Sequence, residues 1–125
     1  MKLPILLFDT DPVAAGVLSM QLRHAGFATH VTFDGAAAIA SARGRQFASI
    51  VVIADLADSQ MRHCLQQIRD ADTGAWLIVI SDPTLDRAQQ VVHELGGDAT
   101  MELPFTVSDL AQRLSALPNR SRRIA

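Results

Sequence analysis

The chain has 125 residues, of which 49% are hydrophobic and 19% are charged. This length can bury one hydrophobic core and is too short for two domains of ordinary size. A formal net charge of -2 gives no general basic field, which argues against non-specific nucleic-acid binding by the domain itself. With a single cysteine, Cys64, the chain cannot form an intramolecular disulfide, which fits a reducing compartment. We expect Cys64 to be a packed core thiol.

Five short strands are predicted along the chain. Residues 5–8, 50–53 and 76–80 are continuous apolar runs, which are typical of parallel strands buried on both faces. Residues 27–33 form a less apolar strand, nearer an edge of the sheet, and residues 99–103 form a short last strand. No run approaches the ~20 apolar residues of a membrane span, and the first residues lack a signal-peptide pattern. We therefore expect a soluble, cytoplasmic protein without membrane contact.

A helical pattern follows each predicted strand. The expected N-terminal caps of the five helices are Asp11, Asp34, Ser59, Asp82 and Ser108. In the first helix, Val17, Leu18, Leu22 and Ala25 are expected to form the apolar face. The strict alternation of strands and helices predicts an α/β fold with a doubly wound parallel sheet.

We expect one domain over residues 1–117, followed by a basic tail over residues 118–125. Arg120, Arg122 and Arg123 lie beyond the last apolar periodicity. This segment is either a solvated terminus or the start of a linker to an output domain, and the sequence leaves both open.

Small or acidic residues follow three of the predicted strands. Asp9 follows the first, Asp55 comes just after the third, and Ser81 follows the fourth. Ligands of open parallel sheets gather beyond the carboxyl ends of the strands. We therefore expect these strand ends to meet and their residues to decide the function.

Four segments of the chain resemble the receiver domains of bacterial two-component response regulators. They are residues 5–12 (ILLFDTDP), residues 26–27, Ser81 at the end of the fourth strand, and residues 103–105 (LPF). The resemblance covers nearly the whole chain without gaps between its motifs. It implies a flavodoxin-like fold: a five-stranded parallel sheet of order 2-1-3-4-5 with five helices.

The resemblance also implies a phosphorylation pocket that has lost its chemistry. In receivers, two acids after strand one and an aspartate after strand three hold Mg²⁺. The strand-three aspartate accepts a phosphoryl group from a histidine kinase, and a Ser or Thr and a Lys contact the phosphoryl oxygens. The matching residues here are Asp9, Thr10, Ile53, Ser81 and Leu103, the last of which precedes Pro104. One metal-ligating acid, the nucleophile and the cation are therefore replaced by neutral groups.

Two alternatives stay open at this point. In the first, Asp55 is the phosphoacceptor and Asp9, Asp11 and Asp55 hold Mg²⁺, although a gapless match places Ile53 at the acceptor position. In the second, the apolar floor of Ile53 and Leu103 binds a small molecule, which rests on fold analogy alone.

The resemblance further implies a protein-interaction surface on the fourth helix, the fifth strand and the fifth helix. Asp98, Asp109 and Arg113 fall on positions that receivers with winged-helix output domains use for a two-fold dimer. Gln89 stands where the partner arginine is expected, and Thr100 where active receivers carry a switching aromatic residue. Asp109 and Arg113 also have the spacing of a simple intrahelical pair.

These residues together predict an atypical receiver, or pseudo-receiver, of a signalling or transcriptional regulator. We expect no enzymatic activity, no phosphorylation and no cofactor, with Mg²⁺ required only under the Asp55 alternative. The expected partners are another protein, a second copy of the chain or a covalently linked output domain.

Overall fold

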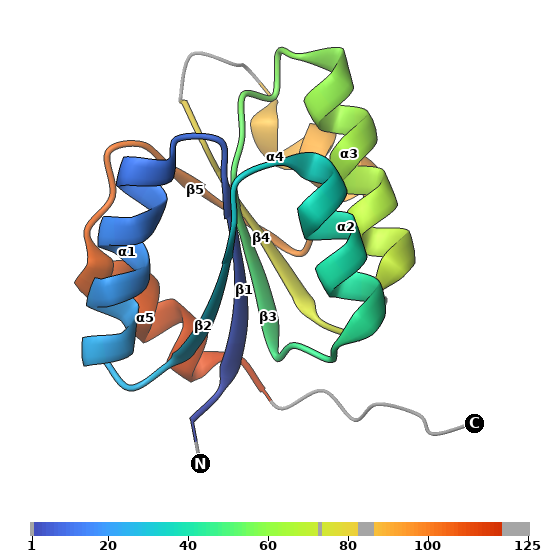
Figure 1. Ribbon diagram of the computed structural model, residues 1–125. Coiled ribbons are helices and arrows are strands. Elements are labelled where there is room, and N and C mark those ends of the chain that lie inside the picture. Colours follow the sequence, from blue (N-terminus) through green and yellow to red (C-terminus); the bar gives the residue numbers. More distant parts are fainter. Residues whose placement is uncertain (1, 73, 83–86, 119–125) are drawn as a thin grey trace.

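The computed structural model describes residues 2–72, 74–82 and 87–118, which form a parallel sheet with helices on both sides (Figure 1). The strands are β1 (Pro4–Asp9), β2 (Ala28–Thr32), β3 (Ser49–Ile53), β4 (Trp76–Ser81) and β5 (Ala99–Glu102). The helices are α1 (Pro12–His24), α2 (Gly35–Gly44), α3 (Ser59–Ala71), α4 (Ala88–Glu94) and α5 (Val107–Ala116). The strand order is β2-β1-β3-β4-β5 and all neighbouring strands are parallel, which confirms the predicted flavodoxin-like fold.

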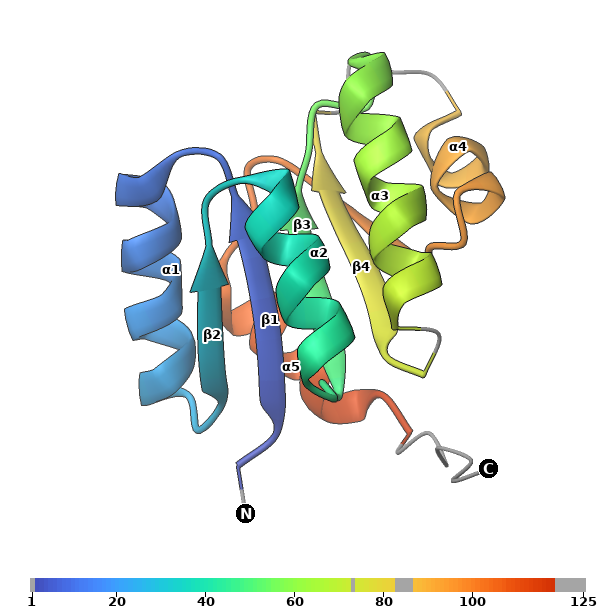
Figure 2. The same cartoon turned by 45° about the vertical axis from the view of Figure 1, so that its right-hand side comes forward.

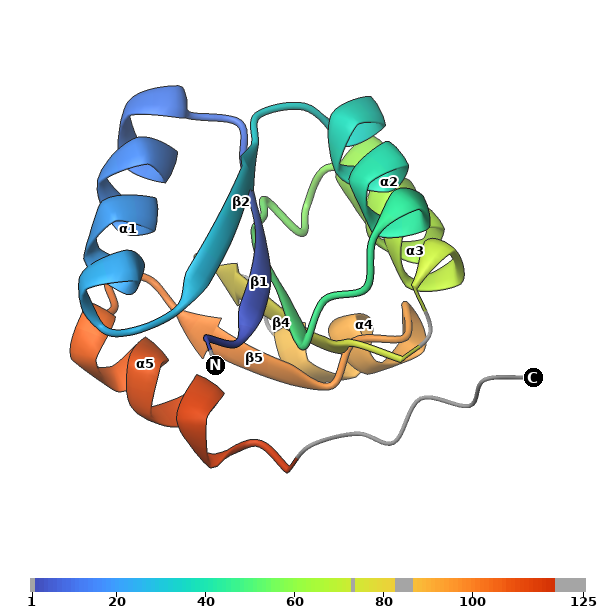
Figure 3. The same cartoon turned by 60° about the horizontal axis from the view of Figure 1, so that its bottom comes forward.

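The sheet separates two hydrophobic cores. Successive side chains of a strand point to opposite faces, so Ile5 and Leu7 of β1 join one core while Leu6 and Phe8 join the other. Helices α1 and α5 cover the first face, and α2, α3 and α4 cover the second (Figure 3). No helix in the described ranges is long and apolar enough to cross a membrane.

Two of the predicted helix caps are confirmed. The Asp11 carboxylate accepts hydrogen bonds from the backbone N–H groups of Val13 and Ala14 at 3.0 and 3.3 Å, and Pro12 occupies the first turn of α1. The Asp34 carboxylate accepts from the N–H of Ala37 at 2.8 Å. Each cap satisfies donors that the first turn of a helix leaves without partners.

Two other caps were predicted wrongly. Helix α3 is capped by Asp58, whose carboxylate accepts from the N–H of Gln60 at 2.9 Å, and not by Ser59. Helix α5 is capped by Thr106, whose hydroxyl accepts from a backbone N–H at 3.1 Å, and not by Ser108. In both helices a suitable side chain stands earlier in the chain, so the predicted serine already lies within the helix.

The fourth helix is shorter than the sequence pattern indicates. Its pattern begins with Asp82 and Pro83, whereas α4 begins at Ala88, after Arg87 with a left-handed φ of 68° and no side-chain cap. Pro83 lies outside the described residues, as does the predicted basic tail apart from Pro118. The Pro118 carbonyl accepts a hydrogen bond from the Trp76 indole at 2.9 Å.

Arg69, near the end of α3, joins three segments of the chain. Its guanidinium donates to the carbonyl oxygens of Asp72 and Ala75 at 3.1 and 2.8 Å and to that of Gly96 at 2.8 Å. It also forms an ion pair with Asp98 at 2.7 Å, and the two side chains are only 13% and 21% exposed. The end of α3, the start of β4 and the turn before β5 are therefore held by one side chain.

We expect the substitution Arg69→Leu to lower the free energy of unfolding by about 2–4 kcal/mol, because it leaves the Asp98 carboxylate and three carbonyls without this donor. Urea denaturation measures the change. The matched control is Arg43→Leu on the exposed last turn of α2, where we expect a change within about 0.5 kcal/mol. Equal losses in the two variants would contradict this assignment.

Two glycines are expected to respond to alanine in opposite directions. A Cβ at Gly16, in the middle of α1, would meet no atom within 4 Å, whereas one at Gly97 would lie 2.3 Å from Cγ1 of Val92. Gly16→Ala should therefore stabilise the protein by about 0.5–1 kcal/mol, since alanine restricts the unfolded chain and favours the helix. Gly97→Ala should destabilise it, because the Val92 side chain and backbone must shift. Thermal unfolding followed by circular dichroism compares the two variants.

Candidate functional site

The carboxyl ends of β1, β3 and β4 meet at one edge of the sheet, as predicted. Asp9 is the register partner of Ile53, and Ile53 is in turn the partner of Ile80 in β4. The backbone N–H of Leu103, just after β5, donates to the carbonyl of Ser81 at 2.9 Å. The structure therefore brings Asp9, Ile53, Ser81 and Leu103 to a common rim.

Asp9 is the one buried carboxylate of this rim among the described residues. It is 6% exposed, and its Oδ1 accepts a hydrogen bond from the backbone N–H of Asp11 at 3.0 Å. The next residue, Thr10, is exposed. Asp9 thus fixes the turn between β1 and α1, and its neighbour supplies a hydroxyl in place of a second acid.

Ile53 and Leu103 make the adjoining part of the rim apolar. Both side chains are partly buried and pack against the hydrophobic core on the side of α1 and α5. Neither can act as a nucleophile, bind a cation or donate a hydrogen bond from its side chain. Beside the Asp9 carboxylate the rim therefore presents hydrocarbon.

Asp55 lies two residues beyond the register partner of Asp9 and outside the strand. Its side chain is exposed, and its carboxylate accepts from the backbone N–H of Ala57 at 3.0 Å. Its carbonyl accepts from the N–H of Asp58 at 3.1 Å. Asp55 therefore shapes the turn into α3, just as Asp58 caps that helix and Asp11 caps α1.

These residues do not fit a divalent cation. Mg²⁺ is bound through oxygen ligands, commonly with carboxylates, in octahedral geometry. At the rim, one carboxylate is accompanied by the hydroxyls of Thr10 and Ser81 and by the hydrocarbon of Ile53. Within residues 2–72, 74–82 and 87–118, no three His, Cys, Asp or Glu side chains are grouped so that they could hold a metal.

Asp98 has a structural role that the sequence did not indicate. Besides its ion pair with Arg69, its Oδ2 accepts from the backbone N–H of Leu77 at 2.8 Å. Asp109 and Arg113 are exposed on α5 and, among the described residues, form no ion pair with each other. Asp98 therefore fastens β4 to the start of β5, and the surface predicted for Asp98, Asp109 and Arg113 stays a prediction.

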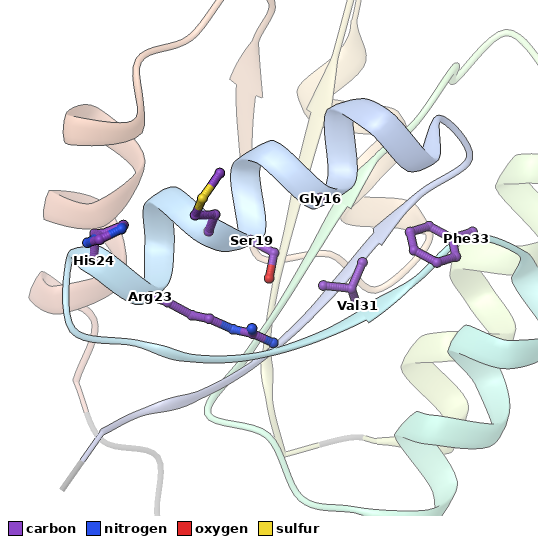
Figure 4. Close-up of a pocket in the computed structure, with 7 residues that line it drawn as sticks. Gly16, Ser19, Arg23, His24, Val31 and Phe33 are labelled. Carbon is purple, nitrogen blue, oxygen red and sulfur yellow. The ribbon is translucent and has the colours of Figure 1, made fainter.

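Away from the rim, open grooves lie among the described residues, and two of them border helices α1 and α4. One, of about 620 Å³, lies between α1 and β2 (Figure 4). Val31 of β2 and Phe33, the residue just after β2, project into it. The other, of about 230 Å³, lies between α4 and β5, beside Thr100. Ile53 and Leu103 line neither groove, so neither is the apolar floor considered for a small molecule.

Known proteins of similar sequence and fold support the receiver assignment. The chain is 31% identical over 119 residues, 94% of its length, to the probable transcriptional regulatory protein TcrX of Mycobacterium tuberculosis, of which it covers 50%. It spans about half the length of the curated relatives it matches. No protein-family model matches the chain.

Two solved structures show the same fold. A CheY-like receiver domain from Methanospirillum hungatei JF-1 superimposes with a TM-score of 0.78 at 16% identity, with 92% of each chain covered. The receiver domain of a sensor histidine kinase of Pseudomonas aeruginosa PAO1 gives a TM-score of 0.76 at 21% identity, with 92% of this chain and 96% of that one covered. The latter holds a magnesium ion in its active site cleft.

The chain therefore has the fold of CheY-like receiver domains. Its relatives in sequence are transcriptional regulatory proteins.

Cys64, on α3, packs against the core as predicted and faces Gly35 at the start of α2. Burial raises the pKa of its thiol, and the negative charge of Asp34 raises it further. The thiolate fraction at a given pH is therefore smaller than for a free cysteine. We expect iodoacetamide to alkylate Cys64 at least about tenfold more slowly in the native protein than in urea. Equal rates measured by mass spectrometry would contradict a packed thiol.

Proposed function

We propose that this protein is an atypical receiver that transmits a signal by protein contact, without phosphoryl transfer. The observation that carries the proposal is the strand register, which sets Ile53 directly beside Asp9. In the receiver pattern this is the position of the nucleophilic aspartate. An isoleucine there leaves the domain with its scaffold and without its acceptor.

The neighbouring residues support the same interpretation. Attack on an anionic phosphoryl donor needs a nucleophile and positive charge that gathers the phosphoryl oxygens. Leu103 stands where receivers carry the lysine, and Thr10 where they carry the second acid. The chain's one lysine, Lys2, precedes β1 and so lies toward the opposite edge of the sheet. The three losses are mutually consistent, since each removes a part that is useless without the others.

The competing function is phosphorylation of Asp55, with Asp9, Asp11 and Asp55 as metal ligands. The three carboxylates have separate local roles: Asp9 accepts from a turn N–H, Asp11 caps α1, and Asp55 shapes the loop before α3. Among the described residues, these carboxylates are not grouped so that three of them could hold one ion. The geometry therefore favours contact over phosphorylation.

The relatives suggest where such a contact would act. They are transcriptional regulatory proteins about twice as long as this chain. We propose a cytoplasmic domain that regulates transcription through a linked output domain or a separate protein. Under this proposal the domain performs no enzymatic step.

Incubation with acetyl phosphate and Mg²⁺ should add no phosphate to the protein. Beryllofluoride with Mg²⁺ should cause no change in the backbone amide signals of its NMR spectrum. Phosphorylation is measured by intact-mass spectrometry. Tryptophan fluorescence is less suitable, because Trp76 lies at the start of β4, at the end of the sheet opposite the rim. A stoichiometric gain of one phosphoryl group would overturn the proposal.

Two variants serve as controls for this experiment. Asp55→Asn abolishes any labelling if Asp55 is the acceptor, and has no effect otherwise. The triple variant Thr10→Asp, Ile53→Asp, Leu103→Lys restores the three missing groups and should gain labelling that depends on Mg²⁺. Labelling of the parent chain that Asp55→Asn removes would establish the competing function.

A further inference from the structure

The outer face of α1 is unusually apolar. Among the described residues, the exposed large hydrophobic side chains are Leu3, Val13, Val17, Met20 and Phe33. Val13, Val17 and Met20 lie on α1 and are 75%, 47% and 54% exposed, and Phe33 follows β2 beside it with 47%. The sequence pattern placed Val17 on the buried face of this helix, whereas Ala15, Leu18, Ser19 and Leu22 are the residues it buries. A contiguous exposed patch of this kind marks an interaction site.

Charge is absent from the same face. No residue between Asp11 and Arg23 is charged, and Gln21 is the one polar residue among the exposed positions of that stretch. Helix α3 shows the usual pattern. Its exposed positions are all polar: Ser59, Gln60, His63, Gln66, Gln67 and Asp70. The apolar surface of α1 is therefore a local property and not a general feature of this protein.

Gly16, at the middle of this face, has no role in the packing of its own chain. It is exposed and has an ordinary helical backbone, and a Cβ there would meet no atom within 4 Å. Glycine is costly inside a helix and has its use where another backbone approaches closely. In this position it allows a second helix to lie near the axis of α1.

The groove beside α1 adds to this surface. Strand β2 is an edge strand next to α1 (Figure 2). Gly16 and Met20 line the groove from the helix, and Val31 and Phe33 line it from the other side. Arg23 extends from α1 toward β2, where its guanidinium donates to the hydroxyl and the carbonyl of Thr29 at 2.8 and 3.2 Å (Figure 4).

We propose that a second copy of this chain covers this face, with α1 packed antiparallel against α1 of its partner about a two-fold axis near Val17. The charges at the two ends of the helix favour this occupant. Asp11 stands at the N-terminus of α1 and Arg23 in its last turn. An antiparallel pair centred on Val17 sets Asp11 of each copy opposite Arg23 of the other, and a two-fold contact makes both pairs at once.

The bonds to Thr29 use Nε and Nη2 of Arg23, and the exposed guanidinium keeps further N–H groups that can donate to Asp11 of the partner. The dipoles of the two helices also favour the antiparallel arrangement, because the positive end of each helix lies beside the negative end of the other. A helix of another protein would need an uncharged span with the opposite charges at matching ends, which α1 itself already supplies. The charges at the ends of α1 are complementary to those of a second copy placed antiparallel, and we take the second copy as the occupant on that ground.

The expected dimer is weak. Helix α1 has 13 residues, about 20 Å of length at the helical rise. A contact between two such helices lies at the small end of specific interfaces. We therefore expect association in the micromolar to millimolar range.

Sedimentation velocity of the chain over that concentration range tests the proposal. A reversible monomer–dimer equilibrium is expected. Val17→Glu sets like charges together at the axis, and Gly16→Gln props the helices apart while leaving the packing of its own chain untouched. Each should weaken association by at least about tenfold. The matched controls are Gln66→Glu on α3 and Arg113→Glu on α5, which should leave it unchanged.

Cross-linking tests the register of the two helices. In a Cys64→Ala background, Val17→Cys should form a disulfide-linked dimer under mild oxidation, because residue 17 meets its own copy at the axis. Gln66→Cys, equally exposed on α3, should not. Circular dichroism confirms that each variant is folded.

Three outcomes would overturn this inference. They are a monomer at every concentration, a dimer that survives both α1 substitutions, and a dimer lost in Arg113→Glu alone, which would place the interface on α5. The inference goes beyond the proposed function and depends on it only in that the domain acts by contact. Phosphorylation of the protein would refute the proposed function and leave the dimer test unaffected. A protein that is monomeric at every concentration would refute the dimer and leave the proposed function unaffected.

Discussion

The register of β3 between β1 and β4 is the constraint on which the site depends. Ile50, Val51 and Val52 are fully buried, and the ladder pairs Ile53 with Asp9 on one side and with Ile80 on the other. A shift of β3 by two residues would bring Asp55 level with Asp9, but it would also draw the turn before α3 into the sheet. The hydrophobic core thus holds Ile53 at the rim and keeps Asp55 in the loop, whatever chemistry a carboxylate there could offer.

Local patterns in the sequence were sufficient for much of the fold. Continuous apolar runs that alternate with capped helical patterns predicted the order of the elements. Asp11 and Asp34 cap their helices as expected. The strand order came from the resemblance to receivers, because crossover connections alone allow other orders. The neutral residues Thr10, Ile53 and Leu103 were assigned to the pocket by the same resemblance, because the match to the receiver pattern runs without gaps through their positions.

What the sequence could not show depends on contacts between distant residues. Arg69 and Asp98 are 29 positions apart, and neither residue has a local signal that pairs it with the other. In the first helix, Val17 and Leu18 are both apolar neighbours, so periodicity could not tell which of them faces the sheet. The choice is made by the crossing of α1 over β1 and β2, which buries Leu18 and turns Val17 outward.

The two sides of the molecule therefore differ in what they can contribute to signalling. Around α4 and β5, Arg69 and Asp98 fasten α3 to β4 and to the turn before β5, so a shift of that region would have to break an ion pair and several hydrogen bonds. Around α1, the surface is apolar and uncharged, and the glycine at its centre is not required by the fold. Under the proposed function, Ile53 stands where receivers carry the reactive carboxylate, and phosphorylation does not drive a rearrangement of α4 and β5. Under that proposal, recognition takes place through a surface that is already exposed, and α1 is where the described part of the chain presents an apolar one.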